Sequence, residues 1–370
     1  MPTLEVPQLV TTLNLNDPVT LLHMREQAAP KPRFLINHLL RIAPTDIVRT
    51  DEVLIDVKDR SGNKLAPFVV KGHKSSSRSG FKAELITPSR IAPARLLTIA
   101  DTNKRIWLEG IADPLTQQER AMQMAIDDMT ELVENTENSW EYLIAQLIQT
   151  GKYTYTNVKS DRNGDDEQTG EQTVDWTHDV LKDEDWKYTT AASWASEESN
   201  PIADLQAMAR MMRRQGVAPT TLLLGSEAAA ALISHPLVYK LLDNRRMQFG
   251  ELTPRVVEQG GATYGSLIID GLNIQLVDYA GEYVDGSGDV KPFIEPKNAV
   301  LTCEGAVRGI FAGVTQIENC GENFTTRLAP MVPKYYSDVE RDEYKIMLTS
   351  RPAFAPQMLG SFVASTVITD

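Results

Sequence analysis

The stretch DPLTQQERAMQMAIDDMTELVENTENSWEYLIAQLIQTG, residues 113–151, decides how the rest of the sequence is interpreted. Asp113 can cap the start of a helix, Pro114 suits its first position, and Gly151 can end it. Apolar residues recur between them at spacings of seven, four and three, which places them on one helical stripe. We therefore predict a helix over 114–150, on the order of 50 Å long at 1.5 Å per residue. The stripe comprises Leu115, Met122, Ile126, Met129, Val133, Trp140, Ile144 and Leu147.

The opposite side of this predicted helix is acidic. A helix of this length usually spans an elongated domain or forms a coiled coil. Because the heptad-like run is short and the acidic side is wide, we expect the helix to lie across a sheet as a spine. The acidic side carries Asp127, Asp128, Glu131, Glu134, Glu137 and Glu141.

The composition is that of a globular protein. A chain of 370 residues, 42% hydrophobic and 24% charged, can bury a large core in two or more lobes. Its net charge of -13 repels DNA and RNA from the molecule as a whole. Two cysteines, Cys303 and Cys320, provide neither a disulfide framework nor a four-ligand zinc site, which favours a reducing compartment. The first residues lack the pattern of a signal peptide, and no apolar run predicts a transmembrane helix.

The charges are unevenly distributed along the chain. Residues 31–110 hold 15 Lys and Arg against 8 Asp and Glu, whereas residues 111–210 hold 7 against 21. A basic segment and an acidic segment in one chain allow copies to pair head-to-tail. The alternative is that both segments are solvated faces of a single monomer.

The chain divides into arms and a lobe. Residues 1–33 contain several prolines and predict an extended arm. Residues 50–100 predict a projecting β arm that carries the basic tip KGHKSSSRSGF, residues 71–81. Residues 152–158 predict a strand that pairs with TVDW, residues 173–176, and residues 196–305 alternate helices and strands as a compact α/β lobe. Residues 306–350 predict further strands.

The sequence does not complete any of the catalytic or ligand-binding motifs that it partly resembles. A phosphate-binding loop is excluded because Gly72 and Gly80 are eight apart and the next segment is extended. A serine hydrolase motif is incomplete around Ser226, which more simply caps a helix, and His235 falls in a turn. His178 has no second histidine at metal-ligand spacing. We therefore expect no catalytic residue, cofactor or metal.

Two further stretches have simpler explanations than a binding site. The acidic stretch 278–294 departs from the EF-hand pattern, so a hairpin turn at Asp285–Gly288 is the simpler interpretation. The tip at 71–81 lacks the interleaved aromatic residues of a nucleic-acid site, apart from Phe81. Extended arms are stabilised by docking on neighbours, so the sequence indicates a subunit of an assembly.

The order of these parts resembles the lambda-like phage major capsid protein E family, whose members have the α+β Hong Kong 97-type capsid fold. Several collinear stretches carry the resemblance. They are PRFLINHLL (32–40), VLIDVKDRSGNKLAPFVV (53–70), LITPSRIAPARLLT (85–98), LIQTGKYTYT (147–156), SWASEESNPIADL (193–205), LLLGSEAAAALISHPLVYKLLDNRR (222–246), YGSLIIDGLNIQLVDYAGEYVDGSGDVKPFIEPKNAVL (264–301), RGIFAG (308–313) and MLTSRPAFAPQMLGSF (347–362).

The resemblance implies a role for each part. Residues 1–33 would form the N-terminal arm, and residues 50–100 the E-loop, a long hairpin over the adjacent subunit. The P-domain would comprise 34–49, 101–195 and 306–350, with its spine helix at 114–150, and the α/β A-domain 196–305 and 351–370.

The resemblance also implies a function. The protein would be the major capsid protein of a tailed phage or prophage, assembled in the bacterial cytoplasm into hexamers and pentamers that enclose DNA in an icosahedral shell. A separate scaffolding protein, a portal and a decoration protein are the expected partners, with no membrane and no sequence-specific DNA contact. A tail-tube or decoration subunit is one alternative, and an α/β enzyme is another.

The resemblance gives the basic tip a candidate partner, namely the acidic side of the spine helix on a neighbouring subunit. The predicted basic contacts are Lys71, Lys74, Arg78 and Lys82, and the predicted acidic contacts are Asp127, Asp128, Glu131, Glu134, Glu137 and Glu141.

Overall fold

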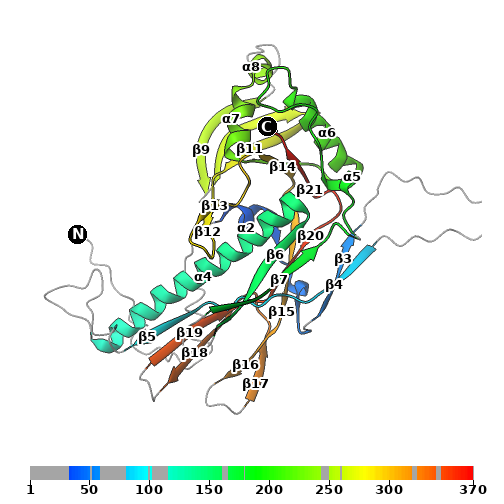
Figure 1. The fold of residues 1–370 in the computed structure, drawn as a ribbon. Helices are drawn as coiled ribbons and strands as arrows, with labels where there is room; N and C mark the ends of the chain where they lie inside the picture. Colours follow the sequence, from blue (N-terminus) through cyan, green and yellow to red (C-terminus); the bar gives the residue numbers. More distant parts are fainter. Residues whose placement is uncertain are drawn as a thin grey trace, which may run out of the picture.

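One long helix organises the fold. The structure is a computed structural model that describes residues 33–50, 52–58, 81–98, 101, 116–160, 166–178, 180–242, 250–258, 261–318, 323–338 and 343–369. Helix α4 (Gln117–Thr150) runs diagonally through the molecule in Figure 1. It ends where predicted, at Gly151, whose φ of +70° and N–H···O contact with Leu147 (2.8 Å) terminate the last turn.

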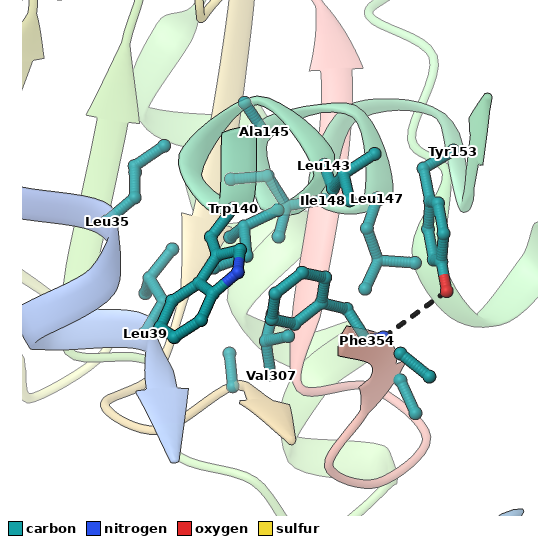
Figure 2. Close-up of a cluster of buried hydrophobic side chains, with 14 of the residues drawn as sticks. Leu35, Leu39, Trp140, Leu143, Ala145, Leu147, Ile148, Tyr153, Val307 and Phe354 are labelled. Atoms are coloured by element: carbon teal, nitrogen blue, oxygen red, sulfur yellow. Dashed lines mark hydrogen bonds between the residues drawn. The ribbon is translucent and has the colours of Figure 1, made fainter. Parts of the chain in front are cut away.

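The apolar stripe of α4 is buried against two small sheets. The first has the order β18-β19-β5, and the second pairs β1 and β2 with one edge of β15 and β20 with the other. Trp140 packs against Phe311 of β15, with ring centroids 5.0 Å apart. Figure 2 shows the surrounding core and the hydrogen bond from the Phe354 N–H to the Tyr153 hydroxyl. The strands are β5 (Ala94–Thr98), β18 (Val332–Asp338), β19 (Glu343–Thr349), β1 (Leu40–Arg41), β2 (Ile47–Val48), β15 (Val307–Ala312) and β20 (Pro352–Pro356).

A six-stranded sheet forms the lobe at the top of Figure 1, with the order β21-β14-β8-β11-β10-β9. All four residues of β8 are buried, as in a strand covered on both faces. Leu222 and Leu224 join the core under α6 and α7, whereas Leu223 joins the core that includes α4. The remaining strands are β9 (Gly250–Glu258), β10 (Gly261–Ile269), β11 (Leu272–Tyr279), β14 (Asn298–Thr302) and β21 (Phe362–Thr366), beside β8 (Thr221–Leu224).

Short helices complete the described fold. In α6 (Pro201–Arg214), the Asn200 side chain accepts a hydrogen bond from the Ala203 N–H and so caps the start of the helix. The prediction for Ser226 is wrong, because Gly225 is the cap of α7 (Ser226–Ser234) and Ser226 is its first helical residue. The others are α2 (Phe34–Leu39), the 3-10 helix η2 (Pro44–Asp46), α5 (Asp183–Trp186) and α8 (Pro236–Leu242).

Within the described ranges, four pairs of antiparallel strands form separate two-stranded sheets beside these layers. They are β3 (Val53–Lys58) with β4 (Phe81–Ile86), β6 (Lys152–Ser160) with β7 (Asp166–Asp175), β12 (Glu282–Val284) with β13 (Val290–Pro292), and β16 (Val314–Glu318) with β17 (Asn323–Arg327). The predicted turn at Asp285–Gly288 is confirmed, since the Gly288 N–H donates to the Asp285 carbonyl at 3.0 Å.

The architecture confirms a mixed α+β fold with a long central helix. One grouping differs from the prediction. Residues 352–356 were expected with the α/β lobe, but as β20 they pair with β15 beneath α4. The predicted N-terminal arm, apart from Arg33, and the predicted strand at 65–70 lie outside the described residues. None of the helices within the described ranges has both the length and the apolar character needed to cross a membrane.

Candidate functional site

The acidic side of α4 is partly free and partly occupied by its own subunit. Asp127 and Glu131 are exposed, and Arg95 of β5 forms an ion pair with Glu131. Burial raises the pKa of Asp128 above its ordinary value; Arg95 opposes that shift, and the neighbouring carboxylates add to it. Around Asp128, in the part of the chain that the structure describes, the carboxylates of Asp101, Asp127 and Glu131 thus outnumber Arg95.

Glu141 does not belong to that surface. The prediction that it lies on the exposed acidic side is wrong, because its side chain is completely buried. Its Oε1 accepts a hydrogen bond from the Leu35 N–H at 3.2 Å, and its Oε2 lies 3.6 Å from Nη1 of Arg33. Helix α2 packs across this side of α4 and turns an acidic position into an internal one. Glu134 and Glu137 are half-buried.

Glu141 also connects α4 to the six-stranded sheet. Burial raises the pKa of the Tyr279 hydroxyl on β11, and the charge of Glu141, to which this hydroxyl is hydrogen-bonded, raises it further. Arg33, at the start of the described chain, has a nine-tenths buried side chain beside the same carboxylate. One buried carboxylate thus connects the segment before α2, the spine helix and the lobe.

Gln149 forms a second connection, which the sequence did not reveal. Its Nε2 donates to the Phe293 carbonyl at 2.9 Å, and its Oε1 accepts from the Glu295 N–H at 2.9 Å and from Nδ2 of Asn298 at 3.2 Å. A glutamine near the end of a helix has no sequence signal that distinguishes this role. The contacts fix the C-terminal end of α4 to the lobe.

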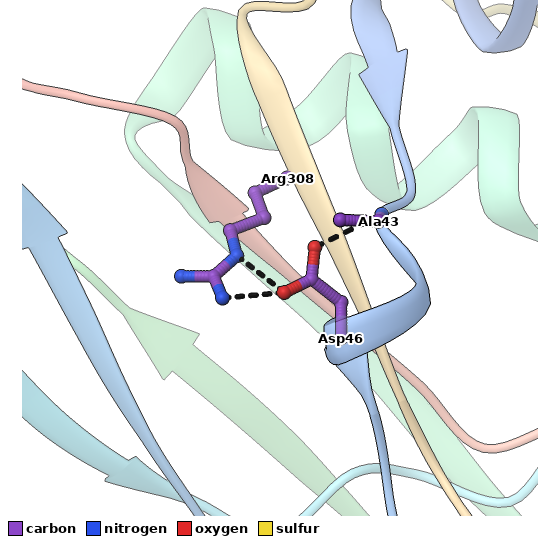
Figure 3. A network of polar contacts seen from close by, with 3 residues as sticks. All are labelled: Ala43, Asp46 and Arg308. Carbon is purple, nitrogen blue, oxygen red and sulfur yellow. Dashed lines mark hydrogen bonds and ion pairs between the residues drawn. The ribbon is translucent and has the colours of Figure 1, made fainter.

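Asp46 and Arg308 form a polar contact at the β1–β15–β2 edge (Figure 3). The Arg308 guanidinium donates through both Nε and Nη2 to Oδ1 of Asp46, with the Nε distance 2.9 Å. The second carboxylate oxygen, Oδ2, accepts from the Ala43 N–H at 3.1 Å. Asp46 is therefore satisfied within the subunit, which assigns it a structural role.

The predicted basic contacts are only partly within the described chain. Lys71, Lys74 and Arg78 lie outside the described residues. Lys82 belongs to β4, where it is paired with Val57 of β3. Its proposed meeting with the acidic side of α4 on another copy stays a prediction.

Exposed apolar side chains gather on three of the hairpins as cross-strand pairs. Large exposed apolar groups mark interaction sites more reliably than scattered single residues do. Phe324 of β17 is the most exposed of these side chains, at 77%. The pairs are Leu54 with Leu85, Val284 with Val290, and Ile317 with Phe324.

The residues considered for catalysis or metal binding have explanations within the fold of the subunit. His235 is buried in the turn between α7 and α8, where its Nε2 lies 3.2 Å from the Ser199 hydroxyl and its Nδ1 accepts from the Leu237 N–H at 3.3 Å. Burial raises the pKa of the Cys303 thiol to about 11, so the thiol stays protonated at neutral pH. Among the described residues, no three His, Cys, Asp or Glu side chains are placed to hold a metal ion.

Comparison with known proteins agrees with this arrangement. Residues 17–367 match the family described as phage major capsid protein E. The structure superposes with a TM-score of 0.61 on a protein assigned as a prophage capsid protein of Escherichia coli CFT073, at 16% identity, over 95% of this chain and 99% of that one. At this identity the likeness shows a shared fold.

Two further solved structures are similar at lower scores. The capsid of Ralstonia phage GP4 gives a TM-score of 0.48 at 10% identity, over 92% of each chain. A phage-related protein of Bordetella bronchiseptica RB50 gives 0.49 at 12%, over 95% of this chain and 96% of that one. Among proteins with curated descriptions, none matches the sequence.

The family match extends over almost the whole chain, including the spine helix, the hairpins and the lobe. The chain therefore belongs to the phage major capsid protein E family and is a structural component of the virion, a subunit of the phage head shell.

Proposed function

We propose that the subunits form hexamers and pentamers in which the basic segment 71–82 of one copy meets the acidic side of α4 on the next. The observation that carries this proposal is the unbalanced charge around Asp128, where, among the described residues, the carboxylates of Asp101, Asp127 and Glu131 act against Arg95. The basic excess of residues 31–110 supplies the complementary charge. Head-to-tail contacts of this kind generate rings when the rotation closes.

The ion pairs supply orientation more than affinity. An exposed pair contributes about 0–1 kcal/mol, so several pairs together set the register without locking it. Apolar area buried between copies supplies most of the free energy of association. Weak individual contacts also allow a misplaced subunit to dissociate during shell growth.

The parts of the chain take roles in this assembly. Residues 1–33 act as an arm, and the hairpin within residues 50–100 reaches over the neighbour. The lobe around the six-stranded sheet meets its copies at the capsomer centre, and the sheets beneath α4 form the P-domain. Residues 352–356 are assigned to this P-domain, because β20 pairs with β15.

A subunit of a head shell is also expected to have other protein partners. A separate scaffolding protein, a portal and a decoration protein complete the proposed set. The net charge of -13 suits a shell that encloses DNA without binding it tightly. Co-expression with the scaffolding protein is expected to convert irregular assemblies into shells of uniform size.

The charge contact is tested by reversing Lys74, Arg78 and Lys82 to Glu. We expect a folded subunit that fails to form shells, because like charges then face each other across the interface. The matched control reverses three exposed residues of the same sign, Lys182, Lys187 and Arg213. Electron microscopy and sedimentation report the assembly, and circular dichroism reports the fold.

Two outcomes of this experiment would contradict the proposed charge contact. Normal shells from the first triple variant, or equal loss of shells from the control, would show that the basic segment has no special role. Restoration of shells by adding Asp127→Lys and Glu131→Lys to the first variant would identify the partner surface directly.

A further inference from the structure

The outer face of the β3–β4 hairpin carries an exposed apolar pair. Leu54 and Leu85 lie directly opposite each other across the two strands and are 63% and 60% exposed. The inner face of the same hairpin is buried in the main core through Val53, Ile55 and Ile86. Because successive residues of a strand point to opposite faces, the two leucines form a separate surface.

The β12–β13 hairpin carries a second surface of the same kind. Val284 and Val290 lie opposite each other and are 66% and 61% exposed. On the inner face, Tyr283 packs against Tyr142 of α4 and Phe293, with ring centroids 4.8 and 5.2 Å apart. The valine pair is therefore supported from below by the spine helix.

The turn of this hairpin is held by a single carboxylate. Oδ1 of Asp285 accepts hydrogen bonds from the Ser287 and Asp289 N–H groups at 2.9 and 3.0 Å. Oδ2 of Asp285 lies 2.5 Å from Nζ of Lys291. A braced hairpin of this kind presents its outer face in one orientation.

The two surfaces cannot cover each other within one subunit. Figure 1 shows the β3–β4 hairpin and the β12–β13 hairpin on opposite sides of α4. In a closed ring of identical copies, one side of each subunit faces the opposite side of the next. The two aliphatic pairs therefore lie on sides that such a ring would bring together.

We propose that Leu54 and Leu85 of one copy pack on the Val284–Val290 pair of the next copy. This contact rests on the ring assembly proposed above and adds its apolar component. Both surfaces are cross-strand aliphatic pairs on hairpins, so the contact buries apolar area on both copies.

The distance between Glu131 and Tyr142 along α4 is compatible with the apolar contact and the charge contact forming on the same helix. Glu131 and Tyr142 are eleven residues apart on α4, about 16 Å at the helical rise. Arg78 precedes Leu85 by seven residues, which spans at most about 23 Å in an extended strand. One arm lying along α4 can therefore place its leucines near Val284 and its basic segment near Glu131.

Cysteine cross-linking tests the contact. Leu54→Cys and Val284→Cys are combined in a background in which Cys303 and Cys320 are replaced by Ala and Ser. Oxidised assemblies are expected to give a ladder of cross-linked oligomers on a non-reducing gel, because the two sulfur atoms come within bonding distance. Each single variant, and the matched pair of Leu96→Cys with Val284→Cys, is expected to give none.

A charge exchange with the native cysteines in place gives a second readout. Leu54→Glu alone and Val290→Lys alone are expected to lose ring and shell formation while keeping the fold, and the double variant is expected to regain ring and shell formation.

The contact is overturned if the assemblies form without the Leu54–Val284 ladder, or if the Leu96 pair cross-links equally. It is also overturned if folded single variants assemble normally. Assemblies that retain the ladder when the basic segment is reversed would separate this contact from the charge contact. A wild-type chain that forms no rings or shells would overturn the ring assembly itself.

Discussion

Replacing Glu141 with Gln removes the negative charge from the buried contact between α2, α4 and β11. Arg33, whose side chain is only 10% exposed, then loses its counter-ion, while the shape of the site is nearly unchanged. Breaking a buried pair from one side costs about 3–5 kcal/mol of unfolding free energy. With an unfolding entropy of about 2.1 cal/mol/K per residue, a 370-residue chain that unfolds as one unit loses about 4–6 °C in Tm.

The measurement is thermal and urea unfolding of the unassembled subunit, followed by tryptophan fluorescence and circular dichroism. Glu131→Gln is the matched control on the same helix, because its pair with Arg95 is exposed and contributes about 0–1 kcal/mol. The double variant Arg33→Met with Glu141→Gln removes both charges, keeps an acceptor for the Leu35 N–H, and is expected to recover most of the loss. A Tm change for Glu141→Gln no larger than that of the control would show that the buried charge does not stabilise the subunit, as would a double variant less stable than the single one.

Gln149, Phe324 and Cys303 each allow a separate test. Gln149→Ala is expected to lower the unfolding free energy by roughly 1–3 kcal/mol, because it leaves polar groups of residues 293–298 without their partner. The control variant Gln123→Ala, at an exposed position of the same helix, is expected to have little effect. Urea unfolding compares the two variants. Phe324→Ser is expected to leave subunit stability within about 0.5 kcal/mol, since the ring is 77% exposed, and to reduce shell yield in sedimentation; loss of stability with normal yield would contradict this. Cys303 is expected to react slowly with thiol reagents at pH 7, at a rate that rises with pH towards about 11 because only the thiolate reacts. Fast labelling of the folded subunit at neutral pH would show that the thiol is less buried than described.

Periodic patterns in the sequence predicted the central helix and most of the lobe. The α4 stripe of Met129, Trp140 and Leu147 is buried as expected, and Asn200, Pro201 and Gly216 bound α6 as the capping rules predict. Such patterns are local, so each element can be recognised without knowing what packs against it.

Contacts between distant segments could not be predicted in this way. Helical spacing alone does not distinguish Glu141 from Glu134, which lies seven residues earlier, and the packing of α2 across the helix makes Glu141 internal. The apolar run around residues 142–148 was a usable sign that α4 is covered more widely there, since Leu143, Ala145 and Ile148 are all buried. The pairing of β20 with β15 likewise depends on the path of the chain and not on local sequence.

In the assembly proposed above, exposed surfaces of the subunit are completed by other copies of the same chain. A cryo-electron microscopy map of shells formed by the expressed protein would show whether this holds at the outer face of the β3–β4 hairpin. We expect Leu54 and Leu85 to be covered by the adjacent subunit. Shells in which that face remains open to solvent, or is covered by the hairpin's own subunit, would contradict the account.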